Sequence, residues 1–181
     1  MRLDELNTEV EIPQGVTVTQ DNKHLTVKGP KGEVTKEFRS PKIMISVDGN
    51  LIKLKSKKPT KREKTIAHTY RAHIRNMVKG VTEPFKYILK ICSTHFPMNV
   101  SISGNKLIVK NFYGEKFPRE LTIKNPDVKV NVNGDQVEVI CSDIEAAGNV
   151  ASDIEQLTRV TKKDLRIFQD GIYIIKKAGK D

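Results

Sequence analysis

The sequence predicts an α+β protein formed by a tandem duplication of two similar small domains, each an array of antiparallel β-strands covered by one helix. Three observations support this fold class. Apolar residues alternate with a period of two through most of the 181 residues, which is typical of half-buried strands. Two segments change to helical spacing instead. The order of strands and helix in the first half then recurs in the second half.

The first 80 residues predict about six short strands followed by one helix. Alternating apolar residues mark the strands at Val16 and Val18, Leu25 and Val27, Ile43, Ile45 and Val47, and Ile52 and Leu54. The helix is predicted over residues 60–79, where the apolar side chains are three or four residues apart. Thr60 and Glu63 have capping-box spacing, and Gly80 stands where a left-handed C-cap is common.

The second half repeats this order. Residues 25–28 (LTVK) align with 107–110 (LIVK) at an offset of 82, and residues 47–50 (VDGN) align with 132–135 (VNGD) at an offset of 85. The second pair predicts two Asx-Gly hairpin turns. Chance similarity between β-rich segments is the alternative, but order, spacing and helix positions all agree.

A second helix follows, with apolar residues at 144, 147, 151, 154 and 157, opened by Ser142 and Glu145 in another capping-box arrangement. Beyond it we predict a one-turn helix start at residues 161–164, a turn at Asp170 and Gly171, and a last strand at 172–175. The expected domains are residues 1–82 and 83–181, the second with a basic C-terminal tail.

The charge indicates a polyanionic partner. Lys and Arg number 32 against 22 Asp and Glu, a formal charge of +10. Residues 1–80 carry +8, residues 81–158 carry −2 and residues 159–181 carry +4. The densest group, seven bases in residues 53–64, could equally be a solvated surface.

Several classes of protein are disfavoured. No apolar run approaches the roughly 20 residues of a membrane span, and the first ten residues resemble no targeting peptide. We therefore expect no membrane association and a cytoplasmic location. Cys92 and Cys141 are 49 residues apart without a CxxC partner, so we expect neither a zinc site nor a disulfide.

No catalytic motif is present, so we expect no enzyme, cofactor, metal or small-molecule substrate. The turn at residues 29–32 (GPKG) is neither a Walker loop nor the helix-joining GxxG clamp of KH domains, and a tight strand-to-strand turn is the better interpretation. His68 and His73, five residues apart, do not fit metal-binding spacing. His95 has no acid or nucleophile near it in the sequence.

Nucleic-acid binding remains. With no Trp and ten Phe or Tyr, the chain lacks the aromatic density of a base-stacking platform, so recognition would depend on charge and shape. The predicted hairpin at residues 111–116 contains Lys116, with Lys110 before it and Arg119 after it, and residues 159–177 alternate bases with Phe168 and Tyr173. These two rings could anchor the backbone or simply fill the second core.

Four segments and the tail follow the pattern of one protein family. The segments are VKGPKGE at 27–33, HIRNMVKGVTEPFKY at 73–87, HFPMNV at 95–100 and NFYGEK at 111–116. The tail matches at Gln156, Val160, Lys163, Arg166, Phe168, Asp170, Gly171, Ile172, Tyr173, Ile174 and Lys177. With these residues the chain resembles the universal large-subunit ribosomal protein "L six" family (called "L nine" in the eukaryotic cytosol), in its archaeal and eukaryotic branch. Residues 142–160 are most archaeal-like, while Pro84 and Tyr113 depart from the family pattern.

The resemblance implies a non-enzymatic ribosomal protein that binds rRNA near the sarcin-ricin loop and the stalk base, mainly through the second domain. Its expected partners are large-subunit rRNA, neighbouring ribosomal proteins and translation factors. It implies RNA-binding roles for Lys116, Arg119, Lys163, Arg166 and Lys177, with a backbone turn at Gly171 that Phe168 and Tyr173 fix. The charge pattern adds Lys110, Arg159, Lys162 and Lys176 to the expected RNA-binding residues.

Two other functions stay open at this point. One is a hydrolase or RNA-modifying enzyme, which would need a pocket with converging titratable groups. The other is an adaptor whose basic faces bind acidic proteins.

Overall fold

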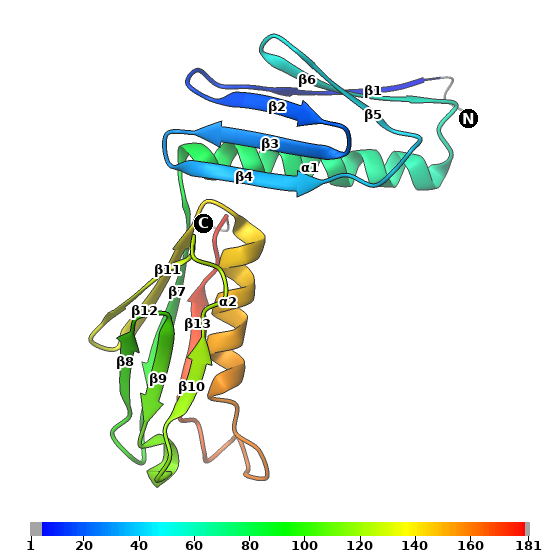
Figure 1. Ribbon diagram of the computed structural model, residues 1–181. Coiled ribbons are helices and arrows are strands. Elements are labelled where there is room, and N and C mark those ends of the chain that lie inside the picture. The colour runs from blue at the N-terminus through cyan, green and yellow to red at the C-terminus, as the bar shows by residue number, and fades with distance from the viewer. Residues whose placement is uncertain (1–4, 180–181) are drawn as a thin grey trace. The chain divides into compact units, whose positions relative to one another are not determined.

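The computed structural model describes residues 5–179, which divide into two compact units, one ending at Pro84 (unit 1) and one beginning at Phe85 (unit 2). The boundary expected from sequence lies two residues earlier. Both units combine antiparallel sheets with one long helix, so the α+β fold class is confirmed (Figure 1).

Unit 1 contains six strands followed by one helix, as predicted. They are β1 (Glu5–Glu11), β2 (Thr17–Asp21), β3 (His24–Gly29), β4 (Gly32–Glu37), β5 (Met44–Asp48), β6 (Leu51–Lys57) and α1 (Lys61–Thr82). The strands form two three-stranded sheets, ordered β1-β6-β5 and β2-β3-β4. Helix α1 contacts β1 and β6 of the first sheet and β3 and β4 of the second.

Unit 2 repeats this plan and extends it by one strand. Its elements are β7 (Phe85–Cys92), β8 (Asn99–Ser103), β9 (Lys106–Lys110), the 3-10 turn η1 (Phe112–Gly114), β10 (Arg119–Thr122), β11 (Lys129–Asn133), β12 (Gln136–Cys141), α2 (Ile144–Leu157) and β13 (Gly171–Lys176). The sheets are β10-β9-β8 and β11-β12-β7-β13, and α2 contacts both. Strand β13, after the second helix, has no counterpart in unit 1.

Equivalent positions of the repeat fill the two cores. Leu25 and Val27 of β3 are 1% and 0% exposed, and their counterparts Leu107 and Val109 of β9 are both fully buried. Helices α1 and α2 close these cores with Ile74 and Ile154, each 0% exposed. Residues that the sequence repeat makes equivalent therefore occupy equivalent places in the two cores.

Two predicted helix caps are wrong. Gly80 lies inside α1, which continues to Thr82 and places Val81 in the core at 0% exposure. Extended backbone at Glu83 and the following Pro84 then end the helix. In unit 2 the N-cap is Asp143 rather than Ser142. The Asp143 carboxylate accepts a hydrogen bond from the backbone N–H of Glu145 at 3.0 Å. The capping box of Thr60 and Glu63 is confirmed.

The tail also differs from its prediction. Residues 161–164 form no helix, and Lys162 adopts a left-handed φ of 61°. The chain instead makes one turn further on, where the Phe168 N–H donates to the Asp164 carbonyl at 2.9 Å. Gly171 is not in a turn, because it begins β13, which confirms the last strand.

We predict that unit 2 folds without unit 1, since it has its own core and covering helix. A fragment of residues 83–181 should unfold cooperatively in urea with a circular dichroism signal typical of a folded α+β protein. A non-cooperative transition of the fragment beside a cooperative one of the whole chain would contradict the two-domain interpretation.

Candidate nucleic-acid interface

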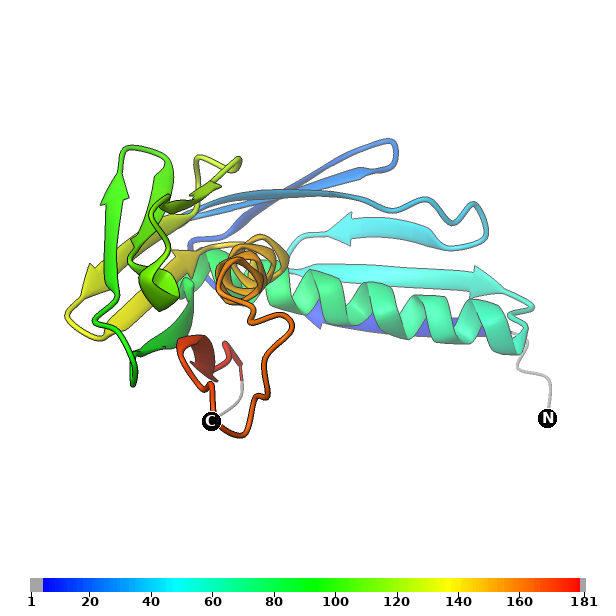
Figure 2. The ribbon, with the colours of Figure 1, turned by 90° about the horizontal axis from the view of Figure 1, so that it is seen from below.

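Three segments meet at one end of unit 2. They are the β7–β8 connection (residues 93–98), η1, and residues 158–170 between α2 and β13, here called the tail loop. The Phe168 ring of the tail loop stacks on His95 at 5.1 Å between ring centroids and meets Tyr113 of η1 edge-on at 5.8 Å. Figure 2 shows α2 end-on, with the tail loop leaving it and returning to β13.

Asp170 ties these segments together. Its carboxylate accepts hydrogen bonds from the backbone N–H groups of Thr94 at 2.7 Å and His95 at 3.1 Å, and its own N–H donates to the Tyr113 hydroxyl at 3.1 Å. The side chain of His95 is also in contact, with Nδ1 at 3.3 Å from the carboxylate. No acid lies near His95 in the sequence, and the fold supplies one from 75 positions away.

The electrostatics of Asp170 follow from these contacts. The residue is 2% exposed, and burial by itself raises its pKa. The hydrogen bonds from Thr94 and His95 outweigh burial and lower the pKa to about 2. Asp170 is therefore ionised and fully hydrogen-bonded at neutral pH, and no ion pair joins its carboxylate to Arg166.

Lys163 packs over the aromatic cluster. Its Nζ atom lies 4.3 Å from the centroid of the Tyr113 ring and 4.7 Å from that of Phe168. Both distances are typical of cation–π contacts. Phe168 is thus part of an internal cluster rather than a freely exposed stacking surface, and Lys163 connects the tail loop to η1.

Arg119, at the start of β10, is engaged within the unit. Its guanidinium donates to both carboxylate oxygens of Glu115 at 2.9 and 2.6 Å and to the Leu157 carbonyl at the end of α2 at 2.8 Å. It also lies 4.1 Å over the Phe112 ring. Because an end carbonyl of α2 needs a donor, this geometry favours a structural role over the RNA contact expected from sequence.

Gly171 and Tyr173 lie on one face of β13. A Cβ atom on Gly171 would be 3.1 Å from the hydroxyl and a ring carbon of Tyr173. The absent side chain leaves room for this ring. The interpretation of Gly171 as a turn residue is wrong, and Tyr173 is 39% exposed above it.

The predicted bases that surround this cluster remain exposed. No carboxylate of residues 5–179 forms an ion pair with Lys110, Lys116, Arg159, Lys162 or Arg166. Lys176 and Lys177 are exposed too, but they lie at the other end of β13, about 17 to 20 Å along the strand. The structure thus gathers five free cations at one end and separates two.

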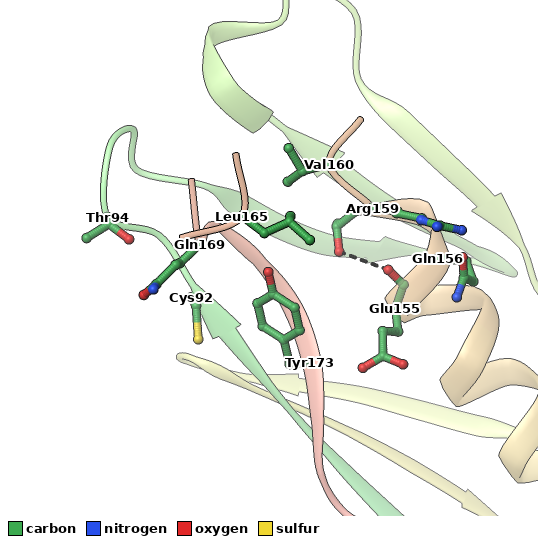
Figure 3. A pocket seen from close by; sticks show the side chains of 10 residues that line it. Cys92, Thr94, Glu155, Gln156, Arg159, Val160, Leu165, Gln169 and Tyr173 are labelled. Carbon is green, nitrogen blue, oxygen red and sulfur yellow. Dashed lines mark hydrogen bonds between the residues drawn. The ribbon is translucent and has the colours of Figure 1, made fainter. Parts of the chain in front are cut away.

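A pocket of about 840 Å³ opens beside the tail loop (Figure 3). It is lined by Cys92, Thr94, Glu155, Gln156, Thr158, Arg159, Val160, Leu165, Gln169 and Tyr173. Its volume lies within the range of ligand pockets, and its walls combine the Tyr173 ring with hydrogen-bonding side chains. Sequence reasoning missed this pocket because its walls come from β7, α2, the tail loop and β13.

The polar groups of the pocket wall also hold β13 in place. The Ile172 N–H donates to the Thr158 hydroxyl at 2.9 Å, and the Ile174 N–H donates to the Glu155 carboxylate at 3.2 Å. Among residues 5–179 no group of three His, Cys, Asp or Glu side chains could hold a metal ion. No helix of that part of the chain is long and apolar enough to cross a membrane.

Comparison with known proteins gives one consistent result. The model of the family described as "Ribosomal protein L6" matches residues 12–84 and 96–171, one segment in each unit. Large ribosomal subunit protein uL6 of Nanoarchaeum equitans is 48% identical over 100% of this chain and 98% of its own. The uL6 proteins of Haloarcula marismortui and Methanocella arvoryzae are 42% and 43% identical, each over at least 94% of both chains.

Proposed function

The chain belongs to the ribosomal protein L6 family, whose members are structural rather than enzymatic, and from this premise we propose that it binds large-subunit rRNA through the tail-loop end of unit 2. The protein is a constituent of the large ribosomal subunit and of archaeal type. The proposed binding place is the factor-binding side, near the sarcin-ricin loop and the stalk base. There the protein would also face neighbouring ribosomal proteins and translation factors.

The observation that carries the proposal is the set of free cations around a fixed cluster. Lys162 and Arg166 lie on the tail loop, which Asp170 and Phe168 fasten to two other segments. A loop held in this way presents its charges without a large loss of conformational freedom on binding. Phosphate groups are the natural partners, because Lys and Arg contacts to phosphates supply most of the affinity in such interfaces.

We assign different roles to two groups of residues at this end of unit 2. Lys110, Lys116, Arg159, Lys162 and Arg166 contact phosphates and 2′-hydroxyls of A-form RNA. Arg119, Lys163, Phe168, Asp170 and Gly171 act mainly on the shape of the surface, since their polar groups or rings are engaged within unit 2. Lys176 and Lys177 reach a different part of the RNA from the far end of β13.

Co-sedimentation tests this function. The protein should migrate with large subunits in a sucrose gradient at moderate salt, and it should also bind protein-free large-subunit rRNA. A protein that stays at the top of the gradient is not a constituent of the subunit. Binding to subunits without binding to free rRNA would favour the adaptor function instead.

A further inference from the structure

Helix α1 carries a basic stripe on its exposed side. Six residues recur every three or four positions, which places them on one face of a helix. They are Lys61, Lys64, His68, Arg71, Arg75 and Lys79, all exposed. At 1.5 Å per residue the stripe is about 27 Å long. The sequence analysis singled out the seven bases of residues 53–64 and did not connect them with the rest of the helix.

No acid of α1 offsets this stripe. Glu63 is the only acidic residue of the helix, it is 8% exposed, and its carboxylate is taken by Lys42 at 3.0 Å and by the Thr60 N–H at 2.8 Å. In the described part of the chain no stripe residue forms an ion pair. Like charges at this spacing destabilise a helix, and bases in its first turn oppose the helix dipole.

The lysines of strand β6 differ from those of the α1 stripe in the acids that lie near them. In the register of β6 and β1, Lys53 and Lys57 lie opposite Glu9 and Glu5. Lys53 also pairs with Asp48 at 3.0 Å. Two of the three lysines of β6, Lys53 and Lys57, therefore lie near acids, while Lys55 lies opposite Asn7 and Met44. The stripe residues of α1 have no such acids beside them. This contrast within one unit indicates that the stripe has a partner outside the unit.

We propose that the α1 stripe binds the phosphate backbone of double-stranded RNA, as a second RNA surface in unit 1. A straight row of cations suits a regular row of phosphates, whose repulsion the stripe would neutralise. The stripe contains no aromatic residue, and nearby Tyr70 is occupied, since its hydroxyl accepts the Ser40 N–H at 2.9 Å. Binding is therefore independent of base sequence. In Figure 2 no strand of unit 1 crosses in front of α1.

This inference goes beyond the proposed function, because it concerns unit 1 and uses none of the residues of the tail-loop end. The test variant is the full chain with Lys64→Gln, Arg71→Gln and Arg75→Gln, since Gln keeps a helix propensity close to that of Lys and Arg. The control variant, Lys53→Gln, Lys55→Gln and Lys57→Gln, removes the same charge from β6. The probe is a 20-base-pair RNA duplex without a matched sequence, titrated at several KCl concentrations.

We expect the stripe variant to reduce the slope of log affinity against log salt by roughly 2 to 2.7, about 0.7 to 0.9 per lost phosphate contact. The control should reduce it far less. The melting temperature of the stripe variant should not fall, because the substitutions relieve repulsion between like charges. The tail-loop cations are intact in both variants, so this result is separate from any failure of the proposed function.

Two outcomes would overturn the inference. Equal slope changes in both variants would mean that only net charge matters. Unchanged duplex binding together with lost binding of a polyglutamate peptide would assign the stripe to an acidic protein.

Discussion

Replacing Asp170 by Ala should lower the free energy of unfolding of unit 2 by about 3 kcal/mol and weaken rRNA binding. The substitution leaves the backbone N–H groups of Thr94 and His95 without their acceptor, and an unsatisfied buried donor costs about 1 to 3 kcal/mol. The tail loop and the β7–β8 connection would then separate. Urea unfolding of the variant measures the loss of stability.

Asp153→Ala is the matched control, because this aspartate is exposed on α2. It should change stability by about 0.5 kcal/mol or less. If the two variants unfold alike, Asp170 is not the anchor of the tail-loop end.

The pH dependence of the free energy of unfolding tests the role of the Asp170 carboxylate in a second way. Its folded pKa of about 2 lies below the unfolded value of 3.8, so its contribution to stability is present above pH 4 and is lost as the pH falls toward 2. The contribution corresponds to about 2 kcal/mol. Asp170→Asn should therefore flatten the loss of stability between pH 4 and pH 2. Parallel curves for the two proteins would contradict the assignment.

Replacing Gly29 by Ala should destabilise unit 1 by about 2 kcal/mol, within the range for overpacked sites. A Cβ atom at this position would lie 2.8 Å from Cγ2 and 2.9 Å from both Cβ and the carbonyl oxygen of Val81. The same carbonyl accepts the Lys31 N–H at 3.0 Å, so the turn and the last turn of α1 would move apart. Chemical denaturation of the variant gives the loss directly.

This variant also distinguishes the two interpretations of the turn at residues 29–32. A structural turn predicts lower stability, with rRNA affinity unchanged under conditions where the variant is folded. A phosphate clamp predicts that the folded variant, besides being less stable, also binds rRNA more weakly.

The strands, the duplication and the helices could be predicted because they follow from local patterns. Alternation of apolar residues reports burial on one face of a strand, and the repeat places Leu25 and Leu107 in equivalent cores. Helix ends were less predictable. Glycine is common at the C-terminal cap of a helix, which made Gly80 the expected end of α1. Burial of Val81 instead favours two more helical residues, so tertiary packing outweighs the local preference.

The candidate site was predictable in composition but not in arrangement. The sequence indicates which residues are basic, yet Asp170 and His95 meet across 75 positions and Arg119 and Leu157 across 38. Local sequence patterns do not predict contacts between residues so far apart in the chain. For this reason the sequence predicts an RNA contact for Arg119 and a turn at Gly171, whereas their neighbours in space show that both residues support the fold.

The most direct test of rRNA binding by the tail-loop end compares two double variants of unit 2. Lys162→Gln with Arg166→Gln removes two tail-loop cations, and Lys124→Gln with Lys129→Gln removes two exposed cations, one from the β10–β11 connection and one from the start of β11. The affinity of each protein for large-subunit rRNA is measured across salt concentrations. The tail-loop variant should bind more weakly, with its salt slope reduced by roughly 1.4 to 1.8, while the control keeps the wild-type slope. An unchanged slope with a lowered melting temperature in the tail-loop variant would show that these charges hold the fold and do not contact RNA.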